Sequence, residues 1–108
     1  MSTANAYAGE AELVINGCPC RLKLTLGALV ALESHLAEDS LMALVQRFET
    51  ARFSASDVLA LLAAGLAGAG HDMTRQDLAR ADIAGGPVAA AQVAAELLAR
   101  SFALPGAP

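Results

Sequence analysis

Hydrophobic and polar residues alternate along residues 9 to 24, a pattern typical of a β-strand pair. Asn16-Gly17, in the middle of this segment, is the strongest short signal of a hairpin with a type I′ turn, because both turn residues need positive φ. With that turn, one face receives the apolar positions Ala11, Leu13, Ile15, Cys18, Cys20, Leu22 and Leu24. A one-residue slip would move all of them to the other face, so the pattern also predicts the register.

The same register places charged residues opposite one another on the second face. Glu12 faces Arg21 and Glu10 faces Lys23, which predicts two cross-strand ion pairs in solvent. Pro19 lies where its missing N–H would point away from the first strand, because the pair beside the closing pair of a two-residue hairpin is not hydrogen-bonded. The second strand is therefore expected to be an edge strand.

From Thr25 onward the apolar period changes from two to about 3.6, which predicts helices. Thr25 is expected to cap the first helix, and Asp39 or Ser40 the second. In the first helix, the residues expected to face inward are Leu26, Leu29, Val30, Leu32 and Leu36. In the second helix, they are Leu41, Leu44, Val45 and Phe48.

Two further helix starts resemble capping boxes with Asp in the place of Glu. They are Ser54 to Asp57 and Thr74 to Asp77. Pro87 suits the first turn of a last helix that runs to about residue 102. The glycines of the third helix, which are Gly65, Gly68 and Gly70, are expected to loosen its end.

The 108 residues are enough for one modest core and too few for two. We expect a single α+β domain over residues 1–108, with a hairpin at about 9–24, four to five short helices within about 25–102, and a flexible tail at 103–108.

Composition excludes several classes of protein. Hydrophobic residues make up 56% of the chain and charged residues 17%, so a folded protein is expected. The net charge is −4 and no basic cluster occurs, which speaks against nucleic-acid binding. The apolar runs are broken by glycine and too short for a bilayer, and residues 1–13 do not resemble a secretory signal. We therefore expect a cytoplasmic protein with reduced cysteines.

Cys18 and Cys20 could in principle form a disulfide or join His35 and His71 around zinc. Residues i and i+2 of a strand are poorly placed for a disulfide, since their Cα atoms lie about 6.5 to 7 Å apart. The spacing also matches none of the usual zinc patterns. Both thiols are therefore interpreted as small apolar core residues, and no metal or cofactor is expected.

No catalytic set is evident. His71 and Asp72 are adjacent and rarely face one another, and His35 lies among apolar neighbours at a helix end. The glycines after Leu61 do not fit a dinucleotide fingerprint. The chain is therefore not expected to be an enzyme, and its large apolar residues become candidates for partner binding: Phe53, Phe102, Met42 and Met73.

Three stretches of the chain resemble a known family. They are "GEAELVINGCPCRLKLTLGALVALESHLAEDSLMALVQRF", "FSASDVLALLAAGLAGAGHDMT" and "AAELLARSF", which together span roughly residues 8 to 102. They are similar to the small tail proteins of gene transfer agents, which are related to prophage tail genes. Members of that family have been labelled tail tube proteins, whereas their size and gene setting look like those of phage tail assembly chaperones.

The resemblance implies a role in virion assembly. A tube subunit would be expected to be rich in strands, and the sequence predicts a single hairpin. The resemblance therefore favours a tail assembly chaperone that binds the long, helical tape measure protein, or other tail proteins, until the tube polymerises. A structural tube or connector subunit remains the alternative, a metal- or thiol-dependent enzyme is a further one, and homo-oligomerisation is left open.

Overall fold

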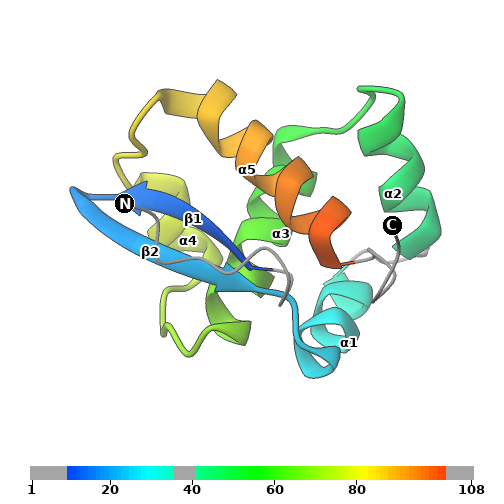
Figure 1. The fold of residues 1–108 in the computed structure, drawn as a ribbon, viewed down its shortest axis with the longest axis horizontal. Helices are drawn as coiled ribbons and strands as arrows, with labels where there is room; N and C mark the ends of the chain where they lie inside the picture. Colours follow the sequence, from blue (N-terminus) through cyan, green and yellow to red (C-terminus); the bar gives the residue numbers. More distant parts are fainter. Residues whose placement is uncertain (1–9, 36–40, 102–108) are drawn as a thin grey trace, which may run out of the picture.

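The computed structural model describes residues 10–35 and 41–101, and in them a hairpin precedes five helices (Figure 1). The elements in chain order are β1 (Glu10–Ile15), β2 (Cys18–Lys23), α1 (Leu26–His35), α2 (Leu41–Glu49), α3 (Ala55–Gly68), α4 (Arg75–Arg80) and α5 (Gly86–Ser101). The expected α+β class, with its N-terminal hairpin, is confirmed.

The hairpin has the predicted register. β1 and β2 pair antiparallel, from Glu10 with Lys23 to Ile15 with Cys18. Asn16 and Gly17 have φ values of 51° and 79°, as a type I′ turn requires. Local turn chemistry thus decides which side chains of both strands face the helices.

The outer edge of β1 is engaged by a distant loop that the sequence did not predict. Ile15 forms an antiparallel bridge with Ile83, the Asn16 N–H donates to the Asp82 carbonyl (2.7 Å), and the Ala84 N–H donates to the Val14 carbonyl (3.1 Å). The Val14 carbonyl therefore points outward, away from β2. This is expected for a pair, here Val14 and Pro19, that is not hydrogen-bonded across the hairpin.

Pro19 therefore lies on the outer edge of β2. Within residues 10–35 and 41–101, β2 pairs only with β1, so its prediction as an edge strand is confirmed. Because proline has no N–H, a further strand could not form a complete ladder there.

The charged face contains a contact that was not predicted. Lys23 lies opposite Glu10 in the register, and Arg21 also approaches Glu10, with 3.9 Å between Arg21 Nε and Glu10 Oε1. Glu10 is only 9% exposed, and Arg100 Nη1 of α5 donates to its carbonyl oxygen at 2.9 Å. The last turn of α5 thus packs over the start of β1 and removes Glu10 from solvent. The predicted ion pairs of Glu12 with Arg21 and of Glu10 with Lys23 stay predictions.

α3 is the central helix, and its glycines are contact points. It packs against β2, α1, α4 and α5. A Cβ atom at Gly65 would lie 2.6 Å from Leu97 Cδ2 and 3.0 Å from Leu22 Cβ, and one at Gly68 would overlap the Lys23 carbonyl oxygen. α3 ends at Gly68, and Gly70 follows with a φ of 92°, so the helix ends among the glycines as expected. Gly65 and Gly68 have a further role that was not predicted, because they let α3 approach its neighbours closely.

The predicted caps are confirmed where the structure describes them. The Ala28 N–H donates to Thr25 Oγ1 (3.1 Å), and both capping boxes close: the Asp57 N–H donates to Ser54 Oγ (3.0 Å) and the Asp77 N–H to Thr74 Oγ1 (3.0 Å). The cap predicted at Asp39 or Ser40 lies outside the described residues.

The core consists of aliphatic side chains from the hairpin and the helices. Its largest fully buried members are Ile15, Leu22, Leu32, Leu44, Leu61, Leu62, Leu66 and Leu97. The inward positions predicted for α2 are confirmed, with Leu44 fully buried and its neighbours packed against the core.

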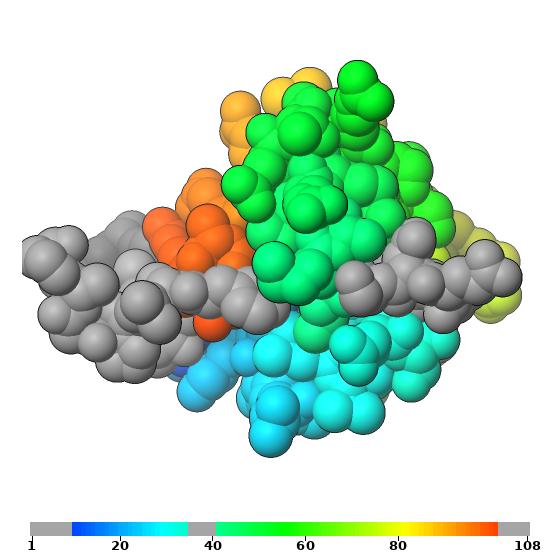
Figure 2. Space-filling view, turned by 90° about the vertical axis from the view of Figure 1, so that its right-hand side faces the viewer, coloured from blue at the N-terminus to red at the C-terminus, as the bar shows by residue number. Residues whose placement is uncertain are grey.

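The stripe predicted for α1 is partly wrong. Leu26 and Val30 are 79% and 59% exposed, while Ala28 and Leu32 are buried. α1 is apolar around most of its circumference, so periodicity could not decide which side faces the core. Figure 2 shows α1 and α2 side by side at the surface. Leu36 lies outside the described residues.

Candidate functional site

The best candidate site is an apolar groove between α3, α4 and α5, of about 470 Å³. Its larger lining residues are Phe53, Val58, Leu59, Leu62, Leu78 and Ile83. Its other lining residues are small or compact: Ala55, Ala79, Pro87, Ala90 and Ala91. We call this feature the apolar groove; its lining contains no charged residue.

Phe53 lines the apolar groove and is held by an aromatic stack. Its ring lies 4.6 Å from that of Phe48, centroid to centroid, with 7° between the ring planes. Phe48 belongs to α2 and Phe53 to the segment that leads into α3. Because Phe48 packs against the core, the stack ties Phe53 to α2.

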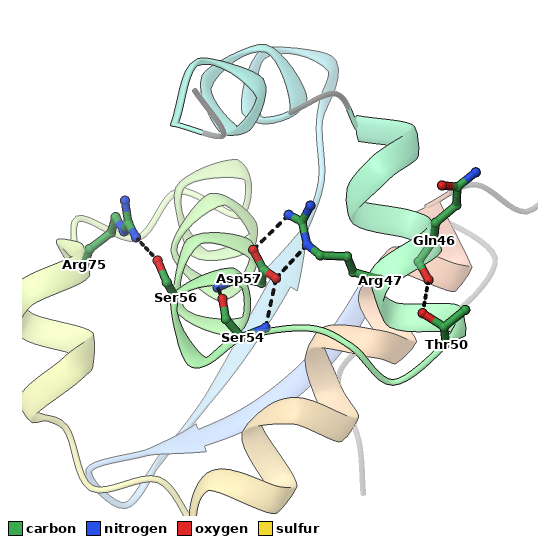
Figure 3. A network of polar contacts seen from close by, with 7 residues as sticks. All are labelled: Gln46, Arg47, Thr50, Ser54, Ser56, Asp57 and Arg75. Carbon is green, nitrogen blue, oxygen red and sulfur yellow. Dashed lines mark hydrogen bonds and ion pairs between the residues drawn. The ribbon is translucent and has the colours of Figure 1, made fainter. Parts of the chain in front are cut away.

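An ion pair joins the same two elements. Arg47 of α2 donates from Nε to Asp57 Oδ2 and from Nη2 to Asp57 Oδ1, both at 2.9 Å (Figure 3). The Asp57 carboxylate also accepts from the Ser54 N–H at 2.9 Å. The two-pronged geometry is the strongest form of an Arg–carboxylate contact, so α2 is tied to the first turn of α3.

The electrostatics of Asp57 follow from these contacts. Burial acts to raise its pKa, but the hydrogen bonds from Arg47 and Ser54, together with the Arg47 charge, outweigh burial and hold the pKa below its ordinary value. Asp57 is therefore ionised at neutral pH and acts as an anchor for α2 rather than as an acid or base.

The four predicted partner-binding residues are not gathered at one site. Phe53 lines the apolar groove, whereas Met42 is 62% exposed on α2. Met73 packs against the core and lines a separate, polar hollow beside the hairpin turn. Phe102 lies outside the described residues, so its contact with a partner stays a prediction.

The two thiols occupy different environments. Cys18 is exposed beside the turn at the tip of the hairpin, so the expectation of a core position is wrong for this residue. Cys20 is half-buried against the core, and both cysteines are free. Burial, and then the neighbouring Cys18, raise the pKa of the Cys20 thiol.

The polar candidates do not assemble into a chemical centre in the part of the chain described. His71 and Asp72 are both exposed in the loop before α4. No group of three His, Cys, Asp or Glu residues suited to a metal ion occurs within residues 10–35 and 41–101. None of the described helices is long and apolar enough to cross a membrane. The side chain of His35 lies outside the described residues.

Comparison with known proteins decides the family. The model of the family described as "Phage tail tube protein, GTA-gp10" matches residues 8–104. The chain belongs to this family. It is thus a phage-like tail protein of the gene transfer agent type, and its family is one of structural tail proteins rather than enzymes. Searches of curated proteins and of solved structures found no match.

Of the residues that line the apolar groove, only Phe53 was identified as a binding candidate from the sequence. The lining comes from three helices and from the loop that contains Ile83, which no local pattern brings together. One signal of the groove was present in the sequence. Val58 and Leu59, which follow the capping box, make α3 apolar on more than one side. A helix of that kind needs partners on several faces.

Proposed function

We propose that this tail protein is a tail assembly chaperone that binds the tape measure protein, or another tail protein, in the cytoplasm during tail morphogenesis. The observation that carries the proposal is that both outer edges of the hairpin are hindered from pairing with a further strand. The outer edge of β1 is engaged at one end by residues 82–84 and at the other by Arg100, and the edge of β2 carries Pro19.

Closed strand edges matter because a ring of subunits joined by their sheets requires free edges. An added strand would meet a proline on one side of this hairpin and occupied backbone groups on the other. The apolar groove, by contrast, is open to a partner. Binding through a helical groove suits a chaperone for a long helical client.

The alternative is a structural tube or connector subunit. The description of the family favours it, and membership implies contact with other tail proteins or with further copies of the chain. A subunit of this kind would have to associate through helical faces, for example through the exposed Leu26 and Val30 of α1.

Co-expression with the tape measure protein tests the proposal. We expect the two chains to co-purify, the tape measure protein to become more soluble, and purified particles to lack this chain. Phe53→Glu should abolish co-purification because it places a charge in the apolar groove, whereas Phe53→Leu should preserve it. Finding the chain in mature tails at ring stoichiometry would instead favour the tube subunit.

A further inference from the structure

We propose that the apolar groove binds a single amphipathic helix of the client, one with an acidic residue beside its apolar stripe. This inference rests on the proposed function and names the chemistry of the segment that is bound. Three features of the groove support it. They are the internal backbone hydrogen bonding of the surrounding helices, the small size of several lining side chains, and the positive charge of a neighbouring residue.

The walls favour a helix over an extended segment. α3, α4 and α5 use their backbone hydrogen-bonding groups internally, so an extended peptide in the apolar groove would leave its own N–H and C=O groups without partners. A helix satisfies these groups within itself and can offer an apolar stripe to the lining.

The small wall residues favour the same occupant. Ala79 of α4 and Ala90 and Ala91 of α5 all line the apolar groove. Short side chains at a contact allow helix axes to approach to about 8 Å, the lower end of the usual range. Apolar side chains of the client could then contact the larger lining residues Leu59, Leu62 and Leu78.

A positive charge lies beside the apolar groove, although the chain carries a net charge of −4. Arg75 lines a shallow hollow together with Leu59 and Ala79, two residues that also line the groove, and its Nη2 donates to Ser56 Oγ at 3.4 Å (Figure 3). Of the other charged residues of α4, Asp77 and Arg80 line the hollow by the hairpin turn instead.

Arg75 is thus the charged residue of α4 on the groove side. It lies at the N-terminal end of α4, whereas Asp82 follows the C-terminal end. A carboxylate of the client is therefore expected to lie at the Arg75 end. This preference runs against the net charge of the protein, which by itself would favour a basic ligand.

Two synthetic helical peptides of about 20 residues test the inference, a length above the roughly 12 to 15 residues below which isolated helices are marginal. Both carry leucine at positions i, i+3, i+4 and i+7, and their flanking positions are glutamate in one and lysine in the other. We expect the wild-type protein to bind the glutamate peptide at least about tenfold more tightly in fluorescence anisotropy. Arg75→Glu should reverse the preference.

A matched pair of variants locates the binding site. Ala79 and Ala31 are both exposed alanines in helices, one in the apolar groove and the other on α1. Ala79→Glu should weaken binding of the glutamate peptide about tenfold or more, and Ala31→Glu should leave it unchanged. Circular dichroism on both variants checks that the helices persist.

Several outcomes would overturn the inference. They are equal or tighter binding of the lysine peptide, no binding of either peptide, loss of binding through Ala31→Glu alone, or a change from oligomer to monomer on Ala79→Glu, which would make a second copy the occupant. Co-purification of the tape measure protein with both wild type and Ala79→Glu would refute the groove and leave the chaperone function standing. Failure of wild type to co-purify would refute the chaperone function itself.

Discussion

The two sides of α3 differ in how closely other elements approach the helix. Toward the hairpin, Gly65 and Gly68 bring the helix backbone against Leu22 and Lys23, with no space for even a methyl group. Toward α4 and the N-terminal half of α5, apolar side chains of α3 line an open groove, whereas the C-terminal half of α5 packs closely, with Leu97 against Gly65. The comparison indicates that one side stabilises the fold, while the other is left for a partner.

The first prediction concerns the closed side and has the largest expected effect. Gly68→Ala should destabilise the protein by about 2 kcal/mol or more, since overpacking against a backbone carbonyl costs about 3 kcal/mol and the better helix propensity of alanine returns about 1. Thermal unfolding should show a midpoint lower by about 10 °C.

The matched variant on the open side is Ala79→Leu. It adds a larger apolar side chain at an exposed position of the groove wall, and its stability should stay within about 0.5 kcal/mol of wild type. If Ala79→Leu proved as damaging as Gly68→Ala, the distinction between a closed and an open side would be lost.

The second prediction concerns the ion pair that holds α2, and through it Phe53, beside the apolar groove. Arg47→Ala should cost about 1.5 to 3 kcal/mol, the range for hydrogen bonds to charged groups. Its effect should concentrate in α2, which hydrogen exchange would report as faster exchange of residues 41–49. A uniform effect along the whole chain would contradict the proposed local role.

The same pair makes a prediction about pH. Because the pKa of Asp57 is lower in the folded protein than in the unfolded chain, its contribution to stability is present above about pH 3.9, the unfolded value, and disappears as the pH falls through the lower folded value. Asp57→Asn should therefore unfold with a weaker dependence on pH in this acidic window. Urea titrations at several pH values measure the difference.

The smallest effects are expected for the two cysteines. Both belong to β2, the strand that packs against the closed side of α3. Cys18→Ser should change stability by less than about 0.5 kcal/mol because the side chain is exposed, and Cys20→Ser should cost about 1 kcal/mol. Cys18 should also be alkylated faster, since Cys20 is half-buried and its pKa is raised. Mass spectrometry after brief iodoacetamide treatment gives the order, and faster labelling of Cys20 would contradict it.

Local signals in the sequence were sufficient for the parts of the fold that local chemistry determines. Asn16-Gly17 gave the register of the hairpin, and Ser54 and Thr74 gave the starts of α3 and α4, because turns and caps depend on a few adjacent residues. Long-range packing was not predicted. The roles of Gly65 and Gly68 depend on what lies beside them, and no periodicity contains that information.

The candidate site was predictable only in part for the same reason. Phe53 was selected as a large apolar residue at the end of an element, and it does line the groove. Val30 of α1 was expected in the core, yet it is exposed, because α1 offers apolar residues on opposite sides. Which apolar side stays open is decided by the other helices, and a single helical segment does not reveal it.

Hydrogen exchange on the co-purified complex with the tape measure protein tests the central claim most directly. The account predicts slower exchange than in the free protein at residues 55–62, 75–80 and 86–92, which border the apolar groove, and little change at residues 10–24. Protection along the outer edge of β2, at residues 18–23, with none around the groove, would contradict it and indicate association through the sheet.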